Sequence, residues 1–350
     1  MGTTVDLGLP SYRPPHLAIK NDTVGRVYLE QHDPNGPLRV SNSELQTWKE
    51  CHRKWWLAYY SGLQLDSEHD ELHGARSLGS RVHAALEHYY TQDTPVLEFL
   101  KQMYQDAENY AVQTNRQDQL EALWKEYDLA HAMMSGYIDW VEAEGIDDGI
   151  DVVATEDTLE VKTSIPGVKL RGKLDQRVVR KSDQARLFRD FKTVGNLTSP
   201  TKMLHMDEQM MTYHLLEYLD SFQKTGGEPQ WRTDGALYTM LRKVKRTASA
   251  NPPFYGQVEV RHNIETIKSM WMRVIKEIEE IFDARMQLDA GAEPRYVVYP
   301  RPSGDCTWKC DFFPICPMFD DGANVKGMIE AYYKVGDVDA RYNPKEGTNE

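Results

Sequence analysis

The segment Leu170-Arg-Gly-Lys-Leu-Asp175-Gln-Arg-Val-Val179, followed after a polar turn by Leu187-Phe-Arg-Asp190-Phe-Lys192-Thr193, decides the fold of this 350-residue chain. Both halves are apolar-rich runs of strand length, and the turn between them predicts adjacent antiparallel strands. Side chains two residues apart in a strand point to the same face. Asp190 and Lys192 therefore share a face, and Phe191 turns the other way into a core.

Carboxylates on both predicted strands indicate a metal site. Asp175 and Asp190 would repel each other strongly unless a cation lay between them. Carboxylate oxygens are hard ligands that suit Mg²⁺ or Mn²⁺. A lone Asp-x-Lys pattern more often marks a solvated strand face, so the assignment depends on the motifs that accompany it.

The overall charge argues against DNA binding through general basicity, because the formal net charge is −13. The distribution is uneven, however: Lys169–Lys192 contains nine Lys or Arg and three Asp, and residues 242–246 add four basic side chains. This pattern predicts a basic groove on an acidic body. Solvated strand and loop faces are the alternative interpretation.

Nothing in the sequence predicts a membrane protein. The mean hydropathy is −0.63, and no run approaches the roughly 18 apolar residues of a membrane span. The N-terminus lacks a basic-then-apolar secretory pattern, which predicts a cytoplasmic location, or the host cytoplasm for a phage-encoded protein.

Four cysteines, at positions 51, 306, 310 and 316, form a ligand pattern. In a cytoplasmic protein metal ligation is favoured over disulfides. Three thiolates in the loop Cys306-x₃-Cys310-x₅-Cys316-Pro317 and a distant one from Cys51 can close a Cys₄ site. Zinc and a [4Fe–4S] cluster both fit this donor set, and unligated thiols are the third alternative.

The order of the elements predicts an α/β fold, a mixed central β-sheet flanked by helices. The capping box Ser41-x-x-Glu44 predicts a helix that ends at Gly62. His83 lies on a second helix, four residues before Glu87. Further helices are expected over 200–222 and, capped by Asn263, over 263–288, with strands near 151–161, 234–241 and 254–262. Six regions follow: an extended arm docked near Val27–Leu29 (1–40), N-terminal helices (41–93), a helical insertion (94–147), the α/β core (148–300), the cysteine region (301–335) and a flexible tail (336–350).

Seven motifs occur in one order along the chain: Ser41-Asn-Ser43, Cys51, Gly79-x₃-His83, Gly172-x₂-Asp175, Asp190-x-Lys192, Gln209-x₃-Tyr213 and the three late cysteines. This set resembles the PD-(D/E)XK nuclease superfamily, and within it the RecB-like branch with iron–sulfur exonucleases. It is similar to AddB-type nuclease domains and to the fourth CRISPR-associated protein family. No nucleotide-binding helicase motif is present, so the resemblance implies a standalone nuclease, of a kind that also occurs in bacteriophages.

The resemblance implies a restriction-endonuclease-like core and a role for each motif residue. Asp175, Asp190, His83 and the Phe191 carbonyl would bind Mg²⁺ or Mn²⁺, and Lys192 would orient the attacking water. Gln209 and Tyr213 would hold the substrate backbone or the lysine. Cys51, Cys306, Cys310 and Cys316 would hold a [4Fe–4S] cluster that clips the N- and C-terminal parts together. Candidate phosphate contacts, from their position near the motifs, are Arg171, Arg177 and Arg189.

The function that follows from the resemblance is a metal-dependent DNA exonuclease acting on single strands or DNA ends, in recombination, repair or DNA processing. A homo-oligomer and partner proteins of recombination or CRISPR systems are the protein partners it allows. The alternative is a non-catalytic iron–sulfur or zinc protein that binds DNA ends or serves as a scaffold.

Overall fold

The computed structural model of the chain describes residues 38–66, 72–92, 94–225, 233–340 and 342. They belong to two compact units. The first, here the sheet unit, contains Leu38–Asn42 and the described residues from 72 to Val274. The second, here the cysteine unit, contains Ser43–Asp66 and the described residues from Ile275 onward. The predicted arm lies, except for its last three residues, outside the described residues, as does its docking point at Val27–Leu29.

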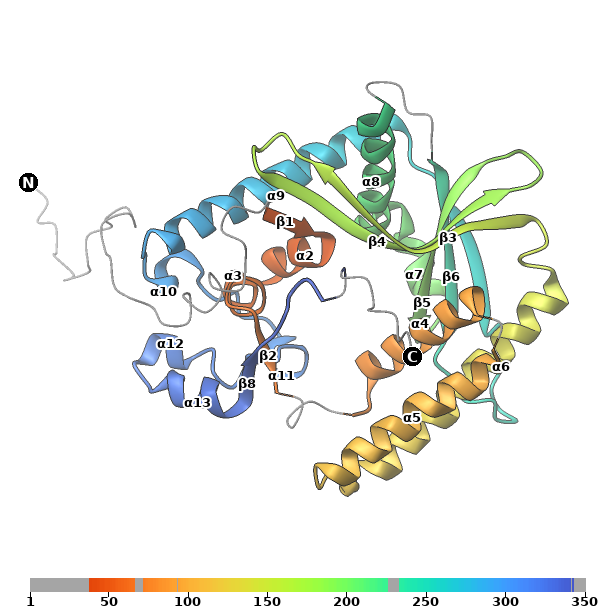
Figure 1. Cartoon of the computed structure of the whole chain (residues 1–350), viewed down its shortest axis with the longest axis horizontal. Helices are drawn as coiled ribbons and strands as arrows, with labels where there is room; N and C mark the ends of the chain where they lie inside the picture. Colours follow the sequence, from red (N-terminus) through yellow and green to blue (C-terminus); the bar gives the residue numbers. More distant parts are fainter. Residues whose placement is uncertain (1–37, 67–71, 93, 226–232, 341, 343–350) are drawn as a thin grey trace, which may run out of the picture. The chain divides into compact units, whose positions relative to one another are not determined.

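The sheet unit is built on one mixed sheet (Figure 1). Its order is β1-β4-β5-β6-β7, and β3 pairs with the other edge of β4. The pairs β1–β4 and β5–β6 are parallel, and the others are antiparallel. The two strands predicted from the opening segment are adjacent and antiparallel, with Gln176 opposite Arg189, so that prediction is confirmed. The strand bounds are β1 Leu38–Ser41, β3 Ile150–Lys162, β4 Val168–Arg180, β5 Arg186–Val194, β6 Thr233–Arg242 and β7 Tyr255–Val260.

One edge of β4 is shared by two strands that do not meet. β1 pairs with residues 168–171 of β4, and β5 pairs with residues 176–179. Residues 172–175 have no ladder partner on this edge, although β3 continues along the other edge past Gly172 and Leu174. Unpaired backbone groups at such a point must find other partners. These four residues are those of the motif Gly172-x₂-Asp175.

Helices cover both faces of this sheet. On one face lie α4 (Ala75–Thr91), α5 (Val96–Gln113), the short 3₁₀ turn η3 (Gln117–Gln119) and α6 (Leu120–Glu144), whose apolar sides form a core with Phe191 of β5. The inward direction predicted for Phe191 is therefore confirmed. The predicted helical segment after residue 93 corresponds to α5 and α6, which pack against α4 and each other (Figure 1).

The other face is covered by α8 (Glu208–Thr225), preceded by α7 (Thr198–Met203) and the 3₁₀ turn η4 (Leu204–Met206). Phe188 of β5 contacts Tyr213 and His214 of α8. The single helix predicted over 200–222 is broken at Asp207, whose backbone is extended. The Asp207 carboxylate accepts a hydrogen bond from the Met210 backbone N–H at 2.9 Å, so it caps a new helix.

The cysteine unit is made mostly of short elements. The strands β2 (Leu63–Leu65) and β8 (Tyr333–Val335) form a two-stranded antiparallel sheet. The long helix α9 (Ile264–Asp289) reaches this unit from Ile275 onward. Its predicted cap is confirmed, because the Asn263 side chain accepts a hydrogen bond from the Thr266 N–H at 2.9 Å. The remaining elements are α2 (Asn42–Glu50), α3 (His52–Trp55), the π-helix η2 (Trp56–Tyr60), α10 (Pro294–Val297), α11 (Cys306–Lys309), α12 (Met318–Asp321) and α13 (Val325–Tyr332).

The first predicted helix is not continuous in the structure. It is interrupted at Cys51, whose backbone is extended with φ −164° and ψ 119°. The buried carboxylate of Glu44, from the predicted capping box, accepts hydrogen bonds from the Trp55 indole at 2.9 Å and from Arg285 at 3.0 Å. Gly62 ends the segment as expected, with φ +64°. None of the described helices is long and apolar enough to cross a bilayer.

Candidate active site

Asp190 and Lys192 lie on one face of β5, as their spacing predicts. The Lys192 ammonium is 2.8 Å from Oδ2 of Asp190. The Asp190 side chain is only 1% exposed, whereas Lys192 keeps 27% of its side chain accessible. A buried carboxylate paired with a cation that solvent can reach forms the centre of the site.

Asp175 adds a second carboxylate from the gap in β4. Its Oδ2 accepts a hydrogen bond from the backbone N–H of Phe191 at 2.8 Å and lies 3.7 Å from Nδ1 of His83. The aspartate therefore takes the place of the missing strand partner, and α4 brings His83 to it. The structure brings together four predicted residues from β4, β5 and α4.

Helix α8 closes the site from the side of Asp190. Gln209 donates hydrogen bonds to Oδ1 of Asp190 at 3.3 Å and to the Tyr213 hydroxyl at 3.0 Å. The helix packs closely on β4 at Gly172: a Cβ there would lie 2.5 Å from the Leu216 side chain and 3.1 Å from the Tyr213 ring. Only a glycine lets α8 approach this far.

Burial and charge act against each other at Asp190 and Lys192. Burial and the neighbouring Asp175 raise the pKa of Asp190 to about 6, although Lys192 acts to lower it. Burial alone would lower the pKa of Lys192, but Asp190 and Asp175 outweigh it and hold that pKa above its ordinary value. Two nearby carboxylates and one ammonium leave the cluster with an excess negative charge, which a cation would neutralise.

The ligand side chains are near each other but not gathered around one point. Among the described residues, no three His, Cys, Asp or Glu side chains are placed to hold a metal ion together.

Sequence reasoning missed Tyr238 of β6. It is directly opposite Asp190 in the parallel ladder, so both side chains lie on the same face. Burial and Asp190 raise the pKa of Tyr238 to about 12, while Lys192 acts to lower it, so the phenol stays protonated at neutral pH. No motif marks this tyrosine, and only the strand pairing reveals it.

The three arginines predicted to bind phosphate are largely buried or paired within the fold. Arg189 is fully buried on the opposite face, where it pairs with Asp147 and contacts Tyr90. Arg177 pairs with Glu217 and Asp157, and Arg171 is 5% exposed. Burial and carboxylate partners disfavour these guanidinium groups as phosphate contacts, a role that stays a prediction.

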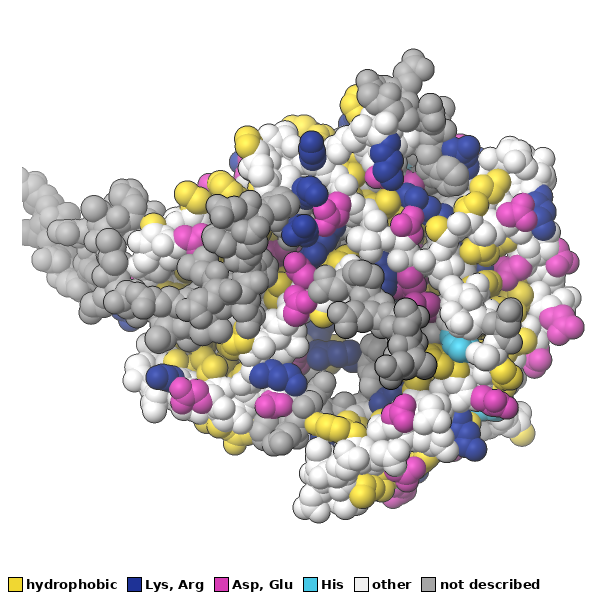
Figure 2. All heavy atoms as spheres, in the orientation of Figure 1, with side chains coloured by type: hydrophobic (Ala, Val, Ile, Leu, Met, Phe, Trp, Pro, Cys, Tyr) yellow, Lys and Arg dark blue, Asp and Glu magenta, His cyan; other side chains and the backbone are white. Residues whose placement is uncertain are grey.

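The predicted basic groove along residues 169–192 is also largely neutralised. Lysines and arginines of this segment pair with carboxylates from neighbouring strands and helices, as Lys169 does with Glu160 and Lys173 with Glu156. On the face drawn in Figure 2, acidic and basic side chains are interspersed and not separated.

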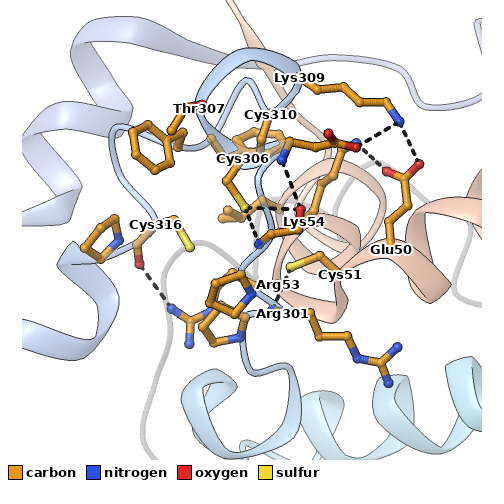
Figure 3. A pocket seen from close by; sticks show the side chains of 18 of the residues that line it. Glu50, Cys51, Arg53, Lys54, Arg301, Cys306, Thr307, Lys309, Cys310 and Cys316 are labelled. Atoms are coloured by element: carbon orange, nitrogen blue, oxygen red, sulfur yellow. Dashed lines mark hydrogen bonds and ion pairs between the residues drawn. The ribbon is translucent and has the colours of Figure 1, made fainter.

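In the cysteine unit, Cys51, Cys306, Cys310 and Cys316 line one pocket of about 630 Å³ (Figure 3). Backbone N–H groups already point at two of the sulfurs: Arg301 donates to Cys51 and Ser303 to Cys306, both at 3.3 Å. Burial raises the pKa of Cys316 to about 11 and also raises that of Cys310. The pocket thus collects the four predicted sulfur ligands, which in the described chain are not close enough to hold a single ion.

Comparison with known proteins places the chain in a family. No curated protein matches the sequence. Among solved structures, SSO0001 is 12% identical with a TM-score of 0.33, over 84% of this chain and 92% of that one. A candidate exonuclease from Eubacterium rectale is 13% identical with a TM-score of 0.40, over 79% of this chain and 87% of that one. Likenesses this distant do not bear on function. The model of the PD-(D/E)XK nuclease superfamily, however, matches residues 39–317. With most of its length matched, the chain belongs to the PD-(D/E)XK nuclease superfamily.

Proposed function

We propose that this protein is a metal-dependent DNA exonuclease that acts on single strands or DNA ends in recombination, repair or DNA processing. The observation that carries the proposal is the convergence of Asp175, Asp190 and Lys192 at the gap in the sheet. Nucleases of this superfamily generally use divalent metals such as Mg²⁺ or Mn²⁺. An excess of buried negative charge beside a gap between strands suits that requirement.

Asp175 and Asp190 would be the principal ligands, with His83 beside Asp175. The Phe191 N–H points to Asp175, and in an extended strand the carbonyl of the same residue projects to the same side. The Phe191 carbonyl is therefore also suited to be a ligand. When bound, the metal polarises the phosphate and lowers the pKa of a water.

Lys192 would act as a fixed cation and not as a general base. Because its pKa is raised by the two aspartates, it stays protonated at neutral pH and cannot accept a proton from water. An ammonium held by Asp190 can orient a nucleophilic water and offset the charge that develops on the phosphate. This role needs the Asp190–Lys192 geometry that is already present.

Gln209 and Tyr213 would maintain that geometry. Gln209 bridges Asp190 and the Tyr213 hydroxyl, so it fixes the rotamer of the carboxylate. A positioned ligand reduces the reorganisation that metal and substrate binding would otherwise require. Gln209, the more accessible of these two residues, would also hold the substrate backbone.

The four cysteines would hold a [4Fe–4S] cluster. A zinc ion needs four sulfurs about 2.3 Å from one point, whereas a cluster holds each cysteine at a different iron. All four cysteines line one pocket, as ligands of a shared cofactor must. Backbone N–H donors to Cys51 and Cys306 suit thiolate ligands. Because burial raises the pKa of Cys316, binding would displace its proton.

The test compares wild type with Asp190→Asn and Lys192→Ala on end-labelled linear DNA, single- and double-stranded, with Mg²⁺ or Mn²⁺. We expect degradation by the wild type and a loss of at least about 100-fold in both variants, the size of effect typical for a group that stabilises the transition state. Lys101→Ala, at an exposed lysine of α5, is the matched control and should retain full activity.

Circular single-stranded DNA separates exonuclease from endonuclease activity. An exonuclease degrades the linear strand and leaves the circle intact. Equal activity of wild type and both variants would overturn the assignment of the site, and cleavage of the circle would overturn the exonuclease class.

A further inference from the structure

The connection between β6 and β7 leaves the sheet beside the catalytic strand. β5 and β6 run parallel, with Lys192 opposite Met240, and the Lys243 backbone N–H donates to the Val194 carbonyl at 2.7 Å. At a rise of about 3.3 Å per residue, Lys243 lies roughly 10 Å beyond the level of Lys192. This is the carboxyl end of two parallel strands, where open α/β sheets bind their ligands.

The two connections at this end of the sheet contain no acidic residue in the sequence. No Asp or Glu occurs between Asp234 and Glu259, a stretch that contains four basic residues. The same is true of the connection after β5, where no acid occurs between Asp190 and Asp207. In a chain with a net charge of −13, two neighbouring connections without a carboxylate form a local positive region.

The four basic residues of the β6–β7 connection are of two kinds. Arg242 and Arg246 hold the loop: Arg242 donates to the Asn251 carbonyl at 2.9 Å, and Arg246 lies 3.7 Å over the Phe254 ring. Lys243 and Lys245 form no ion pair with any residue that the structure describes, and Lys245 is exposed. They differ in this from Lys169 and Lys173 of β4, which are paired.

We infer that Lys243 and Lys245 bind the sugar–phosphate backbone of the DNA strand next to the scissile bond. The inference rests on the proposed function and adds the surface that holds the substrate. At about 3.4 Å per nucleotide, a distance of roughly 10 Å corresponds to the third phosphate or so from the reacting one. Arg242 and Arg246 fix the loop, and the two lysines supply the charges.

The inference is tested by the salt dependence of binding. Fluorescence anisotropy with a labelled single strand in EDTA measures affinity without cleavage, between 0.05 and 1 M salt. Each phosphate contact to a single strand contributes a slope of about −0.7 in log K against log salt. Lys243→Ala/Lys245→Ala should therefore make the slope less steep by roughly 1.4, which is about a 25-fold loss of affinity at 0.1 M salt and almost none at 1 M.

Two further variants keep the outcome specific. Lys243→Arg/Lys245→Arg should retain the wild-type slope, and Lys101→Ala/Lys125→Ala removes the same charge from α5 and α6 and should also retain it. An unchanged slope in the Lys243/Lys245 double alanine variant overturns the inference. So does an equal loss in the Lys101/Lys125 control, which would indicate a general charge effect.

The Asp190→Asn variant separates this inference from the proposed function. It should bind DNA in EDTA and fail to cleave it with metal. If the lysine variants lose affinity while no protein cleaves DNA, the binding surface stands and the enzymatic assignment fails. If Asp190→Asn abolishes cleavage while the lysine variants bind normally, the enzymatic assignment stands and the binding surface fails.

Discussion

Asp175 accepts a hydrogen bond from the backbone N–H of Phe191, with 2.8 Å between Oδ2 and the nitrogen. One carboxylate oxygen of a predicted metal ligand therefore replaces the backbone acceptor that a paired strand would offer to this N–H. This gives the aspartate two functions that substitutions can separate. Asn keeps an acceptor of the same shape and removes the charge, whereas Ala removes both.

We expect Asp175→Asn to fold as stably as wild type and to lose cleavage. Asp175→Ala should lose cleavage and also unfold more easily than Asp175→Asn, by about 1–3 kcal/mol, because the buried Phe191 N–H is left without a partner. Both variants relieve the repulsion with Asp190, so their difference isolates the hydrogen bond. Urea denaturation of the pair measures it, and equal stabilities would contradict the structural role.

Gly172 should not tolerate even a methyl group. A Cβ at this position would lie 2.5 Å from Leu216 and 3.1 Å from the Tyr213 ring. Gly172→Ala should cost about 1–3 kcal/mol of stability through overpacking. It should also lower cleavage, because α8 carries Gln209 and Tyr213. Gly149→Ala is the control, since nothing lies within 4 Å of its added Cβ. Equal behaviour of the two variants in thermal unfolding would disprove the close packing.

Arg189 should matter for stability and not for DNA binding. Its guanidinium is fully buried and paired with Asp147, whose side chain is 26% exposed. Arg189→Met should lower the free energy of unfolding by about 3 kcal/mol, the low end for a broken buried pair, because solvent still reaches the aspartate. The folded variant should bind DNA with the wild-type salt slope. A reduced slope would restore Arg189 as a phosphate contact.

Iron content tests the cysteine pocket. We expect about four irons per chain in anaerobically purified protein and a broad visible absorbance, both lost in Cys51→Ser. Closing a loop of some 250 residues stabilises by ~4–5 kcal/mol in the loop-entropy model, so the variant should also have a lower Tm. Stoichiometric zinc in place of iron would contradict the cluster.

The sequence predicted most of what short-range patterns encode. The β4–β5 hairpin, the shared face of Asp190 and Lys192, the inward Phe191 and the Asn263 cap all follow from periodicity and local hydrogen bonding. The family motifs pointed to residues that are far apart in the sequence. His83 reaches Asp175 from a helix about 90 residues earlier in the chain, and no local pattern could show this.

The features that the sequence could not predict depend on which strands and side chains pair in the fold. The gap at residues 172–175 arises because β1 and β5 share one edge of β4, which only the strand order reveals. Arg189 looks like a free cation until its face is known to be covered by α4 and α6. Tyr238 joins the site through its register with Asp190. Glu44 also accepts hydrogen bonds from the buried Trp55 and Arg285, which no local pattern could show.

His214 should make the protein sensitive to acid. It lies 3% exposed on α8, with its Nδ1 3.0 Å from Nδ1 of His262. Burial, and next the neighbouring His262, lower the pKa of His214 to about 3. In the unfolded chain the imidazole titrates near 6.5, so between these values the unfolded state binds the extra proton. The stability is therefore complete above about pH 6.5 and falls as the pH drops towards 3, by up to ~1.4 kcal/mol per pH unit from this group.

His214→Gln removes the titrating group and keeps a polar side chain that can bond to His262. Urea denaturation of wild type and variant at pH 7, 6, 5 and 4 should show the two curves of stability against pH diverging below pH 6.5, with the shallower slope in the variant. Other acidic groups titrate in both proteins and cancel in the difference. His88→Gln, at a partly exposed histidine of α4, should follow the wild-type curve. Parallel curves for wild type and His214→Gln would show that the buried imidazole does not control the acid response.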